Sequence, residues 1–362
     1  MESHWSNLPK LQKTLELGLN CPQCQVPLST RPEGYVCGNC GDQWNVESGV
    51  IMAPGFDRSR YWGEIPRGRM QHILHRAEVI GPTRALEEWC LVNRNPWLDR
   101  YAFDWRRALC VELVDLPEQA AVLDYGCGYG TVGLTAASKC KRVYLVDSTL
   151  ERIRFAQWRA AELGASNVVA IATQDWRILP LQPASLDLII LNGVLEWVPM
   201  TVKGDPHAIQ LEFLASMRNL LKPGGSLYVG MENRYAIRYF GRYPDDHTGI
   251  RYTSIFPRAI ASLVCKVRGR GPYRTLTWSL GEHRKVLARL GFRKQSIYCM
   301  FPDYRFPEAA CRIDQTALLG VLHGRPWGHS LKTGAKRIIE KAVTLLHLWP
   351  WLVYSYGVVS GK

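Results

Sequence analysis

Three glycines occupy alternate positions along the chain, Gly126, Gly128 and Gly130, and the acidic residue Asp124 precedes the first of them by two positions. The apolar run before Asp124 is typical of a buried parallel strand, and the residues after Gly130 are typical of a helix. Glycine is needed where the backbone adopts positive φ angles, or where a ligand approaches with no Cβ in its way. The stretch therefore predicts a ligand-binding turn between a strand and a helix.

The spacing of the glycines separates two classes of adenosine-containing ligand. A dinucleotide-binding loop has the pattern Gly-x-Gly-x-x-Gly, but Thr131 stands at the position of the third glycine, which comes one residue earlier. The observed Asp-x-Gly-x-Gly-x-Gly closely resembles the first motif of class I S-adenosylmethionine-dependent methyltransferases. S-adenosylmethionine has an ammonium group and no pyrophosphate, and we expect the carboxylate of Asp124 to face that ammonium.

Polar residues also follow the next three predicted strands. Asp147 ends the second strand, about 20 residues after the glycine loop, which is the spacing at which an acid meets ribose hydroxyls in such folds. Asp175 and Trp176 follow the third strand, and Asn192 follows the fourth. Because ligands bind at the carboxyl ends of strands in open α/β sheets, we expect these residues to lie near one ligand.

The resemblance continues through Asp175-Trp, Asn192-Gly-Val-Leu-Glu and Leu221-Lys-Pro-Gly-Gly. It implies an α/β fold with a Rossmann-like seven-stranded sheet and helices on both faces, and it implies methyl transfer from S-adenosylmethionine. The alternative is another Rossmann-like fold in which these residues are ordinary caps and turns. The resemblance assigns cofactor contact to Asp124, Tyr125, Gly126, Cys127, Gly128, Gly130, Asp147, Ser148, Asp175, Trp176 and Asn192.

Four cysteines near the start of the chain form two Cys-x-x-Cys pairs, Cys21 with Cys24 and Cys37 with Cys40. Two such pairs supply four thiolates to one zinc ion, and four protein ligands leave no open position, so we predict a structural site. Two disulfides are the alternative. The other seven cysteines are scattered, mostly in apolar segments, which suits a reducing cytoplasm. The segment resembles the zinc ribbons that accompany many methyltransferases.

The predicted organisation has a zinc ribbon at 1–54, a helical segment at 55–119 and the Rossmann-like domain at 120–362, with insertions at about 233–278 and 301–351. Ser148 and Glu151 predict one helix-capping box, and Ser279 and Glu282 a second. The predicted strands are 120–123, 141–147, 168–172, 186–191, 226–232, 294–300 and 353–359, and the predicted helices include 1–17, 67–80, 82–92, 100–114, 206–221 and 332–347.

The first insertion is rich in tyrosine and basic residues, and long insertions at the ligand edge of a sheet are usually functional. Glu232, directly before this insertion, and His247, within it, are candidate catalytic groups. His247 is a candidate general base because only histidine has an unperturbed pKa near neutrality. The alternative is that the Asp-Asp-His-Thr-Gly sequence ending at Gly249 is only a turn.

The formal net charge of +13 suggests an anionic partner. The favoured acceptor is a small molecule or glycan, because the segments beginning at Tyr61 and Glu232 resemble those of zinc-ribbon methyltransferases from such pathways. One alternative is an RNA methyltransferase of the rRNA guanine-N type, because the ribosomal-RNA guanine-N1 methyltransferases resemble this chain in carrying an N-terminal zinc ribbon. A non-catalytic cofactor-binding scaffold is another alternative. The nearly uncharged residues 342–359 contain Pro350, which argues against a membrane span. Peripheral membrane contact through the basic helix at 332–347, with Trp349 and Trp351, is a further possibility.

Overall fold

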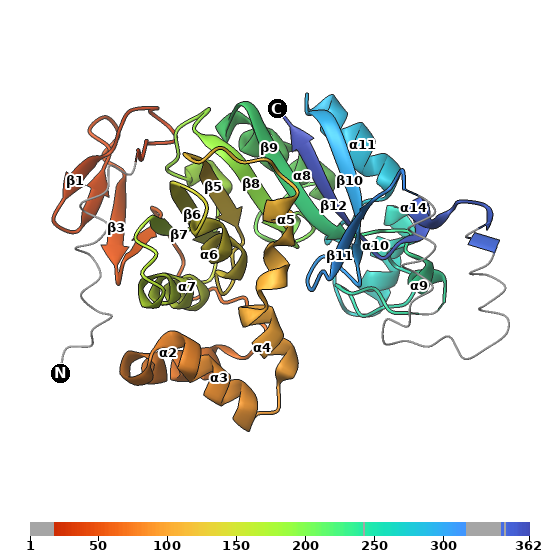
Figure 1. Ribbon diagram of the computed structural model, residues 1–362, viewed down its shortest axis with the longest axis horizontal. Helices are drawn as coiled ribbons and strands as arrows, with labels where there is room; N and C mark the ends of the chain where they lie inside the picture. Colours follow the sequence, from red (N-terminus) through yellow and green to blue (C-terminus); the bar gives the residue numbers. More distant parts are fainter. Residues whose placement is uncertain (1–17, 242, 316–341, 344) are drawn as a thin grey trace. The chain divides into compact units, whose positions relative to one another are not determined.

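The computed structural model describes residues 18–241, 243–315, 342–343 and 345–362 (Figure 1). The chain forms two compact units. The first unit comprises residues 1–191, 215–227 and 362, and the second comprises residues 192–214 and 228–361. The predicted helix at 1–17, and the basic helix at 332–347 except for its last few residues, lie outside the described residues. The predicted domain boundaries stay a prediction.

The first unit is built on a parallel sheet whose strands were all predicted from their apolar runs. The order is β7-β6-β5-β8, and neighbouring strands pair in parallel (Figure 1). Nearly every residue of these strands is buried, as expected where helices cover both faces of a parallel sheet. The elements are β5 (Ala121–Tyr125), α6 (Thr131–Ala137), β6 (Arg142–Asp147), α7 (Leu150–Glu162), β7 (Val168–Ala172) and β8 (Leu186–Asn192).

The cysteine-rich segment forms an antiparallel meander that continues this sheet. Its last strand pairs in parallel with β7, with Ile51 opposite Ile171. The whole of that last strand is buried, so the ribbon is joined to the sheet by both hydrogen bonds and apolar contact. This pairing was not predicted. The strands are β1 (Ser29–Arg31), β2 (Gly34–Val36), β3 (Gln43–Glu47) and β4 (Val50–Met52).

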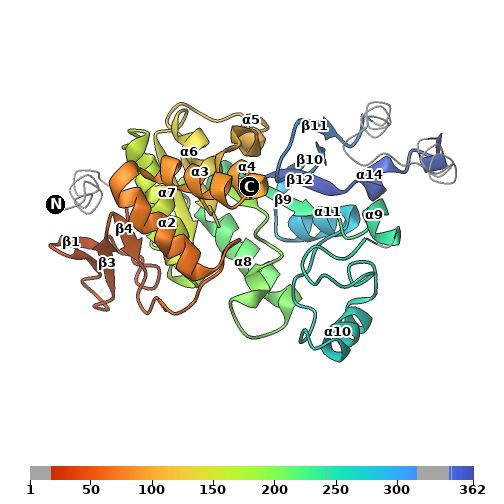
Figure 2. The same cartoon turned by 90° about the horizontal axis from the view of Figure 1, so that it is seen from below.

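Two helices of the next segment, α2 (Arg67–Ile80) and α3 (Pro82–Val92), confirm the prediction and pack against α7 (Figure 2). The single helix predicted at 100–114 is wrong. Asp104 is extended, with φ −70° and ψ 101°, and its carboxylate accepts the backbone N–H of Arg106. The helix is therefore interrupted at Asp104. The segment forms α4 (Pro96–Phe103), the 3-10 helix η1 (Trp105–Ala108) and α5 (Leu109–Glu112).

The second unit contains the antiparallel part of the fold. Its strand order is β9-β12-β10-β11, and β10 pairs with β12 antiparallel, as predicted for the last two strands. Strand β11 lies within the second predicted insertion and was not predicted. Both α8 and β9 run through the two units. The elements are α8 (Pro206–Leu220), β9 (Leu221–Glu232), α9 (Ile237–Phe240), α10 (Arg258–Val267), α11 (Leu280–Arg289), β10 (Arg293–Phe301), β11 (Ala309–Arg312), α14 (Trp349–Leu352) and β12 (Ser355–Gly361).

One of the two predicted capping boxes forms. Ser279 and Glu282 exchange both capping hydrogen bonds at the start of α11. The box between Ser148 and Glu151 is wrong, because α7 begins after Thr149 and has no side-chain cap. The Glu151 carboxylate instead accepts a hydrogen bond from Arg67 Nε at 2.6 Å. A tertiary partner therefore outcompetes the local capping bond.

Every helix in the described part of the chain is too short or too polar to cross a lipid bilayer.

A buried arginine joins the helical segment to the glycine loop within the first unit. Arg159 Nη1 donates to the backbone oxygens of Ala102 at 2.7 Å and Tyr129 at 2.9 Å, and lies 3.3 Å from Thr131 Oγ1. Arg159 is 8 % exposed. Removal of its guanidinium leaves two buried carbonyl groups without this donor.

We predict that Arg159→Met lowers the free energy of unfolding by about 2–4 kcal/mol, because buried acceptors lose a charged donor. Urea denaturation measures the change. The control is Arg84→Met, since the Arg84 side chain is 72 % exposed and pairs with Glu88 on the surface of α3. That variant should change the free energy by less than about 1 kcal/mol. Equal effects from the two variants would contradict the role given to Arg159.

Candidate cofactor site and buried acidic cluster

The glycine loop has the backbone conformation that its sequence requires. Gly126, Gly128 and Gly130 have φ angles of 74°, 58° and 83°. A Cβ on Gly128 would lie 2.4 Å from Arg152 Nη2, and one on Gly130 would lie 2.9 Å from the Cβ of Ala156. The positive φ angles therefore disfavour side chains at all three positions, and a Cβ would also displace Arg152 at Gly128 or crowd Ala156 at Gly130.

Two buried carboxylates hold the loop in place. Asp147 Oδ2 accepts the backbone N–H of Gly128 at 2.9 Å, and its Oδ1 accepts that of Thr149 at 2.9 Å. Asp124 Oδ2 accepts the N–H of Gly133 at 2.8 Å, in the first turn of α6. The acid at the end of β5 thus fixes the helix, and the acid at the end of β6 fixes the loop. The expected contact of Asp124 with an ammonium group stays a prediction.

Burial dominates the titration of both acids. It raises the pKa of Asp124 from 3.8 to about 7, against the opposing effects of the Gly133 N–H and the charge of Arg107. Burial also raises the pKa of Asp147, while the charge of Arg152 and the N–H groups of Thr149 and Gly128 act in the opposite direction. A cation bound beside these residues would favour their ionised forms.

Two further charged residues lie beside Asp147 and were missed. Arg152 Nη2 is 3.8 Å from Asp147 Oδ2 and 3.5 Å from Glu64 Oε1. Glu64 Oε2 is buried and has no hydrogen-bond partner among the described residues. The available signal was the position of Arg152 in the first turn of α7, directly after β6. Glu64 comes from the loop before α2, and no local sequence pattern predicts that this loop lies beside Arg152.

The remaining predicted cofactor residues are divided between the two units. Asp175 Oδ1 accepts the N–H of Arg177 at 2.9 Å, and Trp176 is buried. Asn192 belongs to the second unit, and its side-chain nitrogen and oxygen are buried with no hydrogen-bond partner among the described residues. Contact of these residues with a cofactor stays a prediction, as it does for Tyr125, Cys127 and Ser148, which lie in the first unit.

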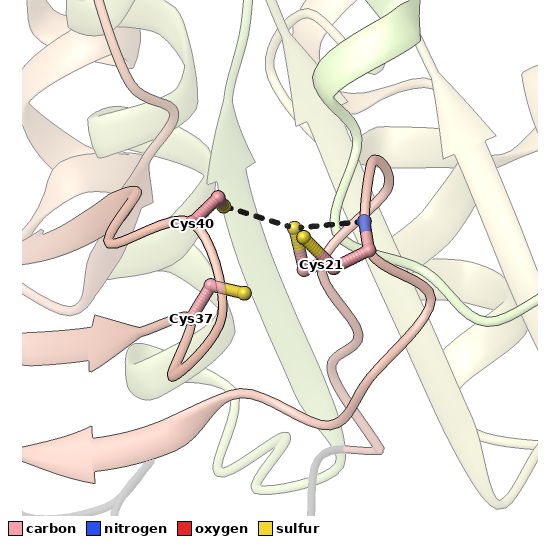
Figure 3. Close-up of side chains that lie close together, drawn as sticks. Cys21, Cys37 and Cys40 are labelled. Atoms are coloured by element: carbon pink, nitrogen blue, oxygen red, sulfur yellow. Dashed lines mark hydrogen bonds between the residues drawn. The ribbon is translucent and has the colours of Figure 1, made fainter.

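The four ribbon cysteines lie close together. Figure 3 shows three of them, Cys21, Cys37 and Cys40, with their sulfur atoms near one another. Cys21 Sγ lies 3.7 Å from Cys40 Sγ, and all four sulfur atoms lie within 4.8 Å of one another. Sulfur atoms about 2.3 Å from one zinc ion in a tetrahedron are separated by roughly 3.8 Å, so the arrangement fits zinc. None of the eleven cysteines forms a disulfide in the structure, so the alternative of two disulfides is not supported.

A second cluster of possible ligands lies inside the second unit. Glu196 comes from the loop after β8, Glu232 is the last residue of β9, and His247 lies in the first predicted insertion. His247 Nε2 is 3.7 Å from Glu196 Oε1 and 3.8 Å from Glu232 Oε2. The three side chains are 0 %, 1 % and 3 % exposed, in that order. The structure therefore brings the two predicted catalytic residues together and adds Glu196.

Burial lowers the pKa of His247, but the neighbouring Glu196 and Glu232 outweigh that effect and raise it to about 9. Burial raises the pKa of Glu232 to about 7, with His247 and Arg305 acting in the opposite direction. In this state the imidazole holds its proton at neutral pH. The predicted role of His247 as general base stays a prediction, as does the catalytic role of Glu232.

We predict that Asp124 makes the free energy of unfolding fall as pH rises towards about 7. Its folded pKa lies above the ordinary value, so its contribution is complete below pH 3.8 and is lost as pH rises through about 7. Asp124→Asn stays neutral, so its free energy of unfolding minus that of the wild type should increase from pH 5.5 to about 7 and then level off. Urea denaturation across this range measures the difference.

The control for this prediction is Asp104→Asn. Hydrogen bonds from Arg106 lower the pKa of Asp104, so its contribution is present throughout this range and is lost only at lower pH. The difference for this control should be constant from pH 5.5 to 8. A constant difference for Asp124→Asn as well would contradict the raised pKa.

Comparison with known proteins agrees with this geometry. Residues 117–238 match the family model described as a methyltransferase domain. The chain is 37% identical over 116 residues to the ubiquinone biosynthesis O-methyltransferase of Xylella fastidiosa (strain M23), a match covering 32% of this chain and 43% of that protein. It is 31% identical over 115 residues to the enzyme of the same name from Xanthomonas euvesicatoria, covering 32% and 44%.

The matches to these curated relatives thus span less than half of the relatives' length. Among solved structures, phosphoethanolamine N-methyltransferase 2 of Haemonchus contortus in complex with S-adenosyl-L-methionine aligns with a TM-score of 0.42 at 14% identity. That alignment covers 73% of this chain and 57% of that chain. On the family match, the relatives and the glycine loop, residues 117–238 belong to the class I S-adenosylmethionine-dependent methyltransferases.

Proposed function

We propose that this chain transfers a methyl group from S-adenosylmethionine to an oxygen atom of a small molecule. The observation that carries the proposal is the glycine loop held by Asp147, with a positive φ at each glycine. The name of the curated relatives, ubiquinone biosynthesis O-methyltransferase, supports a small-molecule hydroxyl as the acceptor. The free thiols support a reducing cytoplasm as the compartment.

Bound S-adenosylmethionine supplies an electrophilic methyl group on a sulfonium. The residues of the chain have to bind the cofactor and the acceptor and align them for the transfer. Each carboxylate oxygen of Asp147 accepts one backbone N–H and retains a lone pair that suits a ribose hydroxyl. The three glycines of the loop have no Cβ, so the cofactor can approach the backbone of the loop closely. Holding two reactants in line contributes roughly 7–11 kcal/mol to such a reaction.

We predict that Asp147→Asn weakens the binding of S-adenosylmethionine about 10- to 100-fold, because a hydrogen bond to a charged acceptor contributes about 1.5–3 kcal/mol. Calorimetric titration measures the affinity. The control is Asp187→Asn, since Asp187 accepts a backbone N–H from Ala121 at 2.8 Å, at the opposite end of β5. The control should bind like the wild type. Failure of the folded wild type to bind would contradict the proposal.

The acceptor class is tested by methyl transfer from labelled S-adenosylmethionine to three panels, namely small phenols and alcohols, oligosaccharides, and structured RNA. Label in the first panel supports the proposal. Label only in oligosaccharides would redirect it to glycans. Label only in RNA would favour the RNA methyltransferase alternative, which rests on the N-terminal cysteine ribbon and on the net charge of +13. Cofactor binding with no transfer would leave the scaffold alternative.

We also propose that Cys21, Cys24, Cys37 and Cys40 hold one structural zinc ion, supported by the convergence of the four sulfur atoms. We predict that the purified chain contains one zinc ion and that Cys37→Ser contains less than a tenth of that amount, because a lost thiolate weakens a closed tetrahedral site. Elemental analysis measures the content. The control, Cys140→Ser, changes a buried thiol outside the ribbon and should retain the zinc. Equal zinc in both variants would contradict the assignment.

A further inference from the structure

We infer that Glu196, Glu232 and His247 bind a divalent metal ion inside the second unit. The inference goes beyond the proposed methyl transfer and does not depend on it. It rests on the distances between the ligand atoms, on carboxylate oxygens that are buried without hydrogen bonds, and on the residues that orient Glu232 and His247.

The three side chains offer one ligand atom each at metal-binding separations. The distances from His247 Nε2 to the nearest carboxylate oxygens are 3.7 and 3.8 Å, and all three ligand atoms lie within 4.8 Å of one another. Carboxylate oxygens and imidazole nitrogens bind such ions at about 2.0–2.2 Å, so two ligands of one ion lie at most about 4.4 Å apart. Both imidazole distances are below this limit. The two carboxylate oxygens lie within 4.8 Å of each other, so at most a small contraction would bring all three atoms to one ion.

Buried oxygen atoms in the cluster lack the partners that they need. Glu196 is fully buried, and neither of its carboxylate oxygens has a hydrogen-bond partner among the described residues. Glu232 Oε2 is also buried and has no hydrogen-bond partner among the described residues. The imidazole is too far from both for a hydrogen bond. Burial of a carboxylate with no hydrogen bond is costly, and a cation between the two carboxylates removes that cost.

Neighbouring residues orient two of the three ligands, Glu232 and His247. Tyr304 donates its hydroxyl to Glu232 Oε1 at 3.2 Å, which leaves Oε2 directed at the imidazole. Asp245 lies on the other side, 3.9 Å from His247 Nδ1, and accepts the backbone N–H of His247 at 3.0 Å. A carboxylate beside one ring nitrogen favours a proton there and leaves the other nitrogen for a metal. Trp197 packs against the imidazole, with ring centroids 4.9 Å apart.

The donor set indicates the kind of ion. Two carboxylates and one imidazole suit Mn²⁺, Mg²⁺ or Zn²⁺, and the cluster contains no thiolate. The two negative charges match one divalent ion. The competing occupant is a proton on His247 with no metal, and the experiment below separates the two. Mn²⁺ is the probe because thiolate sites select softer metals, so the ribbon cysteines retain their zinc.

The test titrates Mn²⁺ into the full zinc-loaded chain, without S-adenosylmethionine or acceptor, and follows free Mn²⁺ by electron paramagnetic resonance. We expect one bound Mn²⁺ per chain and at least a tenfold loss of affinity in Glu196→Gln. The control is Asp246→Asn, which removes a nearby charge whose oxygens are held by the hydroxyls of Tyr239 and Tyr354. That control should stay within threefold of the wild type.

A second measurement guards against a folding defect. Mn²⁺ should raise the thermal unfolding temperature of the wild type and of Asp246→Asn, because an ion that binds only the folded state stabilises it. It should leave that of Glu196→Gln unchanged. No Mn²⁺ binding, or binding that Glu196→Gln leaves intact, would overturn the inference and leave a protonated histidine between two acids. Because no cofactor is present, failure here is distinguishable from failure of the proposed methyl transfer.

Discussion

The carboxylate of Asp147 is the constraint on which the first unit depends. One of its oxygens binds the glycine loop and the other binds the start of α7, so a single buried acid sets the position of both segments. Glycine adopts the positive φ angles of the loop without steric cost, and these bonds select that conformation. Arg152 and Glu64 then extend this acid into a short row of alternating charge.

Local patterns predicted the features that depend on local forces. The seven strands, the glycine turn and the capping box at Ser279 follow from short apolar runs, backbone freedom and neighbouring side chains. The cap at Ser148 and the helix at 100–114 were wrong because tertiary partners and an extended Asp104 decided them. The pairing of Ile51 with Ile171 joins segments far apart in the chain, and parallel pairing leaves no turn signal between them.

Residue types alone predicted the acidic cluster only in part. Glu232 and His247 were singled out by their place at a strand end and in an insertion, but their relation to each other was not. Glu196 stood in a recognised motif with no role assigned to it. The lack of hydrogen bonds to the Glu196 carboxylate can be seen only in the folded chain, where three segments separated in sequence come together. The spacing of residues in the sequence predicts neither their burial nor the distances between them.

The pairing of β4 with β7 has a consequence for the behaviour of the chain in solution. Without the ribbon, β7 would be an exposed edge of an apolar parallel sheet, and such edges recruit strands from other molecules. The ribbon replaces that long edge with β1, which has three residues, two of them exposed. The cysteine-rich ribbon thereby shields the edge of the parallel sheet from pairing with other molecules.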